Sequence, residues 1–111
     1  MKVAVSVDGN RVSAHFGRCE KYVIFEKKDG KEIARKEIPN PGHEPFYLPK
    51  FLSEKGVKKI ITCGIGPKAA GLFGELGIEV VAGVEGNVDE TIGKYLEGKL
   101  KGGAPVCQHT H

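Results

Sequence analysis

The sequence predicts an α/β fold in which helices cover the faces of a mixed five-stranded sheet. Three observations predict this class. Runs of strand length recur five times, a hairpin turn joins two of them, and helical patterns separate the later ones. The predicted order along the chain is therefore β-β-β-α-β-α-β-α. Its second half implies right-handed parallel crossovers, whereas the hairpin adds antiparallel neighbours.

The N-terminal half is predicted to contain three strands. Alternating valines mark a first strand over residues 3–8, and residues 10–18 follow as a loop. Residues 22–28 and 31–38 are two further strands, because Asp29-Gly30 between them is a favoured two-residue hairpin turn. The second strand therefore runs opposite to the first, and the third runs in the same direction as the first.

The C-terminal half alternates helices with strands. Three prolines between residues 39 and 45 exclude a helix or a central strand there, because proline removes backbone donors. Asn87 caps the last helix, and Glu90 three residues later completes a capping box. The remaining predicted elements are helices at about 48–55, 67–77 and 88–96 and strands at 57–63 and 78–82.

Length and composition indicate a single domain, residues 1–98, followed by a flexible Gly-rich tail with cysteine and histidine, residues 99–111. The net charge of +3 is too small and too dispersed to indicate a nucleic-acid partner. The N-terminus lacks the apolar core of a signal peptide, and no run approaches the roughly 20 apolar residues of a membrane span. We therefore expect a cytoplasmic protein without a membrane partner, whose cysteines are thiols.

The soft metal-ligating residues all lie in predicted loops, at strand ends or in the tail. Structural cysteines and histidines are usually buried in apolar elements, so this placement suggests a site for a soft metal or a metal–sulfur ligand. The loops after the first, third, fourth and fifth strands leave the sheet at one edge, where open α/β sheets bind ligands. The residues in question are Cys19, Cys63, Cys107, His15, His43, His109 and His111.

The segment His15-Phe16-Gly17-Arg18-Cys19 combines two kinds of ligand with a cation. Imidazole and thiolate both bind metals, and Arg18 could hold an anionic cluster. The alternative interpretation is a turn in which Phe16 packs, Gly17 supplies a positive φ, and His15 bonds only to backbone.

The segment Gly64-Ile65-Gly66-Pro67-Lys68 lies between a predicted strand and a helix. The helix N-terminus favours an anion there, and Lys68 adds positive charge. A tight strand-to-helix turn is the simpler explanation of the two glycines taken alone, and Cys63 before them could be a buried residue. Together these segments predict a cofactor-binding set of His15, Arg18, Cys19, His43, Cys63, Gly64, Gly66 and Lys68.

Two further segments contain possible metal ligands, and each also has an interpretation without a binding role. His43 lies in a proline-rich connector and is either a ligand at the shared edge or a surface histidine. The tail, Cys107-Gln108-His109-Thr110-His111, could bind a metal or close the site, or it could bind metals adventitiously. The predicted metal ligands are His15, Cys19, Cys63, Cys107 and His109.

Over nearly its whole length the chain resembles the nitrogenase iron–molybdenum cofactor-binding and cofactor-biosynthesis family. The resemblance rests on His15-Phe16-Gly17-Arg18, on residues 40–45, on Gly64-Ile65-Gly66 and on residues 77–81. It implies a ribonuclease H-like three-layer fold and a non-catalytic role in binding and delivering an iron–sulfur or molybdenum–iron–sulfur cluster. His15 is the ligand that the resemblance implies.

The resemblance also implies partners, namely cluster donor and acceptor proteins, including an Mrp-type iron–sulfur carrier ATPase. The chain departs from the family pattern at two places. Many members have alanine where Cys19 stands, and many have Gly-Gly-Met-Gly in place of Cys63-Gly64-Ile65-Gly66. The added thiols could create a different soft site.

Two other classes of function are alternatives to a cluster carrier. A nuclease or phosphoryl-transfer enzyme needs several carboxylates around two metals. Asp8 at the end of the first strand could be a first ligand, but no acidic set is predicted to converge with it. The other class is a metal-free regulatory or interaction module with the same fold. We expect a protein that is not an enzyme.

Overall fold

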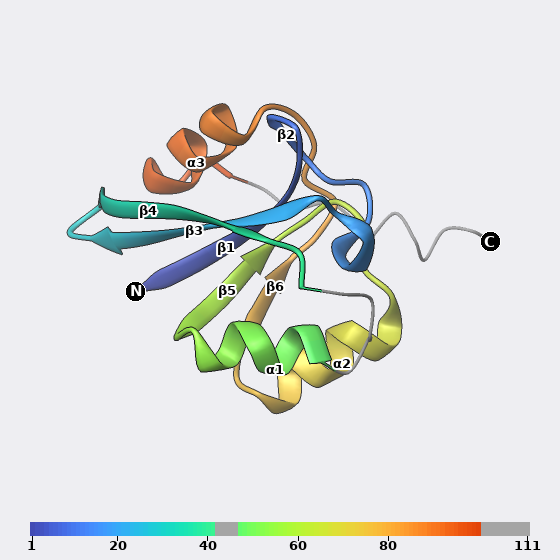
Figure 1. The fold of residues 1–111 in the computed structure, drawn as a ribbon. Helices are drawn as coiled ribbons and strands as arrows, with labels where there is room; N and C mark the ends of the chain where they lie inside the picture. The colour runs from blue at the N-terminus through green and yellow to red at the C-terminus, as the bar shows by residue number, and fades with distance from the viewer. Residues whose placement is uncertain (42–46, 101–111) are drawn as a thin grey trace.

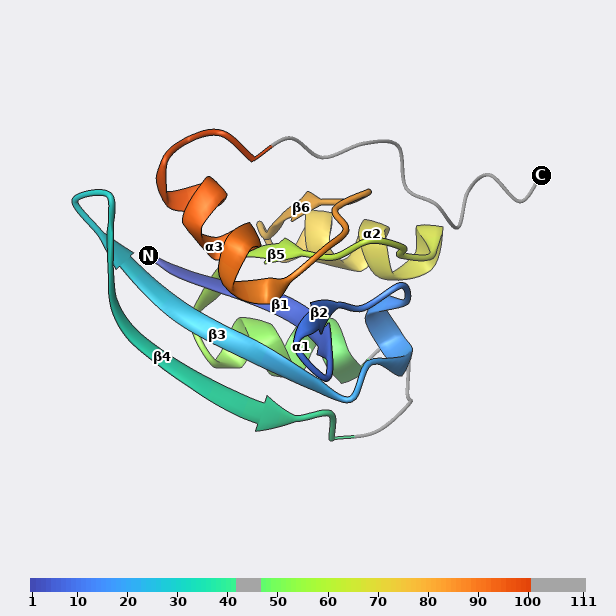
Figure 2. The ribbon, with the colours of Figure 1, turned by 90° about the horizontal axis from the view of Figure 1, so that it is seen from above.

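Three layers make up the computed structural model, which describes residues 1–41 and 47–100. Helices α1 and α2 cover one face of the sheet and α3 covers the other (Figures 1 and 2). The elements are β1 (Lys2–Asp8), β2 (Arg11–Val12), the 3₁₀ helix η1 (Phe16–Arg18), β3 (Lys21–Lys28), β4 (Lys31–Pro39), α1 (Tyr47–Glu54), β5 (Val57–Ile61), α2 (Pro67–Glu75), β6 (Glu79–Val81) and α3 (Val88–Leu96).

The sheet is mixed, as predicted, and its strand order is β4-β3-β1-β5-β6. β1 pairs antiparallel with β3 and parallel with β5, and β5 pairs parallel with β6. The prediction of five strands was wrong by one, because β2 also pairs with β1 and makes the sheet six-stranded. β2 has only two residues, which is too short for an alternating pattern, and its Val12 is buried opposite Val7.

The predicted hairpin turn and the Asn87 side-chain cap are confirmed. Asp29 and Gly30 have φ values of 53° and 76°, which are the positive angles that a type I′ hairpin requires. The α3 cap is present, since the Asn87 side chain accepts a hydrogen bond from the Glu90 amide at 3.1 Å. The element ends are less well predicted: β5 ends at Ile61, two residues before Cys63.

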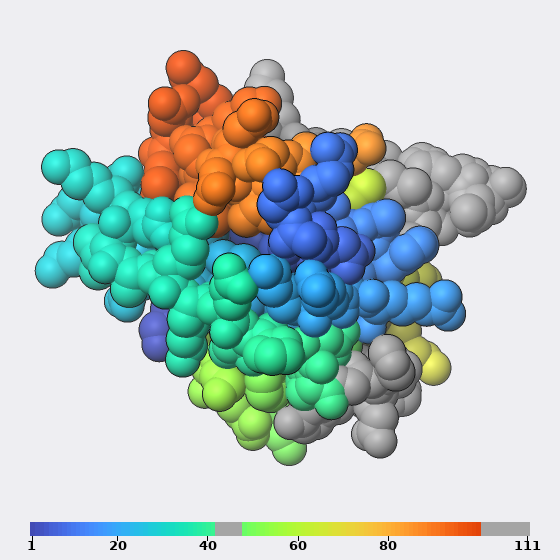
Figure 3. Space-filling model, turned by 45° about the horizontal axis from the view of Figure 1, so that its top comes forward, coloured from blue at the N-terminus to red at the C-terminus, as the bar shows by residue number. Residues whose placement is uncertain are grey.

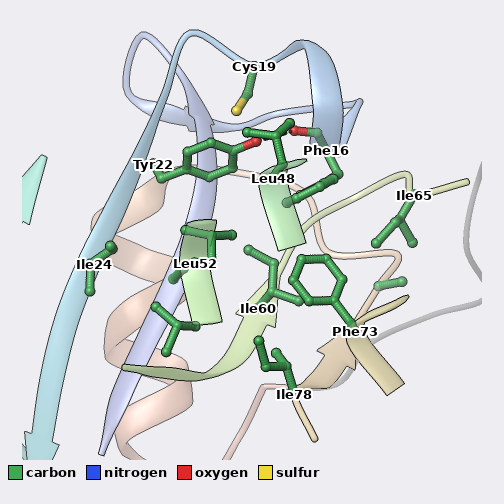
Figure 4. Close-up of a cluster of buried hydrophobic side chains, with 13 residues drawn as sticks. Phe16, Cys19, Tyr22, Ile24, Leu48, Leu52, Ile60, Ile65, Phe73 and Ile78 are labelled. Atoms are coloured by element: carbon green, nitrogen blue, oxygen red, sulfur yellow. Dashed lines mark hydrogen bonds between the residues drawn. The ribbon is translucent and has the colours of Figure 1, made fainter. Parts of the chain in front are cut away.

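The sheet separates two hydrophobic cores. The core between the sheet and α1 and α2 is built around Phe16, Tyr22 and Phe73, which are all buried (Figure 4). The Phe16 ring meets the Phe73 ring edge-on, with 5.1 Å between centroids. The second core lies under α3 and includes Phe25 and Ile92. Because Phe16 belongs to η1, the first core anchors the loop after β2 to the body of the domain.

Strand β4 is joined to α3 across the surface. The Arg35 guanidinium donates to Asp89 at 2.6 Å and also pairs with Glu32 on its own strand. Figure 3 shows the resulting contact between the β3–β4 hairpin, in cyan to green, and α3, in orange. This contact joins the β3–β4 hairpin to the helix that covers the second core.

Across the two described ranges, no helix is both long and apolar enough to cross a membrane. The predicted tail begins at residue 99, and from residue 101 onward it lies outside the described residues, as do His43, Cys107 and His109.

Candidate functional site

The loops that follow β2, β5 and β6 meet at one edge of the sheet, and hydrogen bonds join them. The Phe16 amide donates to the Gly64 carbonyl at 2.8 Å, and the Cys63 amide donates to the Ser13 carbonyl at 3.3 Å. The Gly83 amide in turn donates to the Cys63 carbonyl at 2.8 Å. The predicted convergence of these loops on the carboxyl edge is therefore confirmed.

The loop that contains η1 is held from the interior and from β4. Tyr22 donates its hydroxyl to the Phe16 carbonyl at 2.9 Å. The Asn40 side-chain amide donates to the Cys19 carbonyl at 2.9 Å and to the Gly17 carbonyl at 3.3 Å. The backbone of this loop is thus fixed by groups from β3 and from the end of β4.

Two adjoining grooves open between this loop and the start of α2. They share four residues, and their volumes fall within the range of small-molecule sites. The larger has a volume of about 620 Å³ and is lined by Phe16, Gly17, Arg18, Leu48, Gly66, Lys68 and Ala69. The other has a volume of about 380 Å³ and is lined by His15, Phe16, Gly17, Arg18, Gly64, Ile65 and Gly66.

We call the two grooves together the paired grooves. Five of the predicted cofactor-binding residues line them: His15, Arg18, Gly64, Gly66 and Lys68. The side chains of His15, Arg18 and Lys68 are exposed.

The electrostatics of the paired grooves favour an anion. Arg18 and Lys68 each contribute a positive charge, and none of the described lining residues is acidic. Helix α2 begins at this border, with Gly66 as its N-cap and Pro67 in its first turn, so the positive end of its dipole lies there too. No heavy atom lies within 4 Å of a Cβ built on Gly66, so the glycine leaves this border open.

Cys19 does not line the paired grooves. It is 4% exposed and belongs to the core under α1 and α2, where its sulfur is directed toward Tyr22 (Figure 4). Burial raises the pKa of the Cys19 thiol, although a hydrogen bond with Tyr22 partly offsets the effect. The thiolate form that binds metals is therefore disfavoured at this position.

Cys63 lies in the other core. It is 6% exposed and packs with the residues under α3, so the sheet separates it from Cys19. Within residues 1–41 and 47–100, no group of three or more histidine, cysteine or acidic side chains is placed to hold a metal ion. The structure thus does not bring the two described cysteines into one site, and their role as ligands stays a prediction.

Asp8 has a structural role that the sequence did not reveal. Its carboxylate accepts the Ser13 hydroxyl at 2.7 Å and the Glu20 amide at 2.8 Å, one on each oxygen. These bonds tie both ends of the η1 loop to the end of β1. Asn40 and Tyr22, which support the same loop, also went unpredicted, because nothing in their local patterns marks a long-range hydrogen bond.

Comparison with known proteins shows the family to which the chain belongs. Residues 1–98 match the family model described as dinitrogenase iron-molybdenum cofactor. The chain is 42% identical over 107 residues to the uncharacterized protein MJ0580 of Methanocaldococcus jannaschii, covering 91% of this chain and 90% of the relative.

Solved structures share the fold. The crystal structure of PH0822 is 34% identical with a TM-score of 0.86, covering 94% of this chain and 97% of that one. The apo form of the orange protein from Desulfovibrio gigas is 23% identical with a TM-score of 0.78, covering 94% of this chain and 93% of that one, and shows the fold alone. On the match of residues 1–98, the chain belongs to the dinitrogenase iron–molybdenum cofactor family.

Proposed function

We propose that this protein binds a preformed, negatively charged iron–sulfur or molybdenum–iron–sulfur cluster in the paired grooves and delivers it during metallocofactor assembly, without catalysing a reaction. One observation carries the proposal: an imidazole, two cations and a helix N-terminus surround open grooves that no described carboxylate lines. Membership of the cofactor family supports the same cargo.

The arrangement suits a carrier better than a site that assembles a cluster from ions. Assembly from ions requires several accessible thiolates, whereas Cys19 and Cys63 are both buried. A preformed cluster contains its own sulfide, so the protein needs to supply only charge and His15 as a ligand. Because His15, Arg18 and Lys68 are exposed, a partner can approach the cargo and displace it.

We further propose that the partners are cluster donor and acceptor proteins, with an Mrp-type iron–sulfur carrier ATPase among them, in the cytoplasm. The ribonuclease H-like designation belongs to the same proposal. The strand order β4-β3-β1-β5-β6, with only β3 antiparallel to both of its neighbours, is compatible with it.

The test is anaerobic purification followed by metal and acid-labile sulfide analysis and a visible absorption spectrum. Wild type is compared with His15→Ala and Arg18→Glu, and Lys58→Glu is the matched control. Lys58 is exposed on β5, outside both lining sets, so its reversal changes net charge without touching the paired grooves. We expect iron or molybdenum with sulfide in wild type and control, and less in the two groove variants.

A metal-free regulatory or interaction module is the second candidate, and the burial of both described cysteines is the observation that favours it. A colourless protein that also refuses a reconstituted cluster would support this module. If cluster loading is equal in all four proteins, the cluster does not bind in the paired grooves.

A further inference from the structure

We propose that Asn40 is a positioning residue that sets the direction of Arg18 in the paired grooves. The inference deepens the proposed function and rests on it for the identity of the ligand. The hydrogen bonds of Asn40, from which the positioning role is argued, do not depend on that function.

Asn40 holds the backbone on both sides of Arg18. Its side-chain nitrogen donates to the Gly17 carbonyl at 3.3 Å and to the Cys19 carbonyl at 2.9 Å. The Asn40 amide also donates to the Glu20 carbonyl at 3.1 Å. Asn40 follows directly on β4, so the loop is tied to a strand that lies far from it in the sequence.

The η1 turn cannot hold Arg18 by itself. It has three residues, and the His15 side chain that precedes it makes no capping hydrogen bond. The Arg18 amide reaches the His15 carbonyl only at 3.4 Å, which is long for a hydrogen bond. Short 3₁₀ turns of this kind depend on their surroundings, so the direction of Arg18 depends on the bonds to its neighbours.

The chemistry of the site requires an amide at position 40. Two carbonyl oxygens need two donors, and a primary amide nitrogen has two hydrogens in one plane. An ionised aspartate of the same shape would place acceptors against these carbonyls, and alanine would leave them without this donor. Asparagine therefore suits the position in a way that its nearest analogues do not.

The test is a double-mutant cycle on ligand affinity. Tetrathiomolybdate is the probe, because it is a compact dianion in which molybdenum is bonded to sulfide. Its binding to the reduced full-length chain is measured by anaerobic titration for wild type, Asn40→Ala, Arg18→Ala and the double variant. Asn87→Ala is the matched control: it removes one asparagine hydrogen bond at the α3 cap, outside the paired grooves.

We expect Asn40→Ala to weaken binding of the probe by about 5- to 30-fold. This corresponds to the loss of one or two hydrogen bonds that position Arg18. Asn87→Ala should bind as wild type does. In the Arg18→Ala background, Asn40→Ala should have no further effect, because Asn40 acts through Arg18. An equal loss in both backgrounds, or an equal loss in Asn87→Ala, would mean that Asn40 is only structural and would overturn the inference.

A second measurement separates failure of this inference from failure of the proposed function. Backbone ¹⁵N relaxation of Arg18 and its neighbours is compared between free wild type and Asn40→Ala. If wild type binds neither the probe nor a reconstituted cluster, the proposed function fails, and increased motion confined to residues 16–19 still supports positioning by Asn40. Unchanged relaxation in these amides would overturn the positioning role whatever binds in the grooves.

Discussion

Cys19 is the predicted ligand whose role can be decided most directly, through the pH dependence of stability. The residue is 4% exposed, and burial raises the pKa of its thiol in the folded protein. In the unfolded chain a cysteine titrates near its usual value of about 8.5. The folded state therefore retains the proton to higher pH. The stability that this provides is complete below pH of about 8.5 and is lost as pH rises toward the folded pKa.

The magnitude of this loss has a clear upper limit. A thiol that stayed protonated in the folded protein would cost about 1.36 kcal/mol per pH unit above the unfolded pKa. Between pH 8 and pH 10 the total loss of stability is therefore about 1.9 kcal/mol. Burial also raises the pKa of Tyr22, and Cys19 adds to this effect. Because burial is the largest cause and acts in both proteins, the Tyr22 contribution largely cancels below pH of about 10, where an unfolded tyrosine is still mostly protonated.

The assay is guanidinium denaturation of fully reduced wild type and Cys19→Val at several pH values from about 7 to 10. We expect the stability advantage of wild type over the variant to shrink by up to about 2 kcal/mol as pH rises. A constant difference across this range would refute the argument that burial keeps the thiol protonated. On the same reasoning Cys19→Val should load cluster as wild type does, and loss of loading would make Cys19 a ligand.

Three other predictions concern the structure around the site, and each is measured by chemical denaturation. Asn87→Ala should cost about 1 kcal/mol, since it removes the α3 cap. Phe73→Ala should cost about 3–5 kcal/mol, because Phe73 is fully buried against Phe16, and a cost below 1 kcal/mol would contradict that packing. Asp8→Ala should cost about 1–3 kcal/mol through the Ser13 and Glu20 bonds; a change within 0.5 kcal/mol would argue against that role.

Much of the fold could be predicted because its local signals agree with its topology. The Asp29-Gly30 turn specifies a hairpin, and the helices between later strands require parallel crossovers. Together these place the ligand loops at one edge, which is why five predicted residues do line the paired grooves. β2 and η1 were missed, since two or three residues contain no periodicity and their conformation depends on long-range hydrogen bonds.

Burial of the two described cysteines is where the prediction from sequence was weakest. Cys63 lies two residues after Ile61, and both belong to the core under α3. Strand alternation, continued past the end of β5, places them on the same face, so this signal was available. Cys19 offered no such signal. It precedes β3, and tertiary bonds to Asn40 and packing near Tyr22 hold it inward.

The separation of buried thiols from exposed cations bears on how cargo would be released. On the proposed function, the described part of the site holds a cluster through Arg18, Lys68 and His15. Attraction between exposed charges is weak and is screened by salt, with a Debye length of about 8 Å at physiological ionic strength. An acceptor that supplies thiolates could then remove the cluster without first breaking several metal–thiolate bonds. A rigid loop holds Arg18 and His15 in place before the cluster binds and so reduces the entropy lost on binding, which is why Asn40, Tyr22 and Asp8 matter to the site although they do not line the paired grooves.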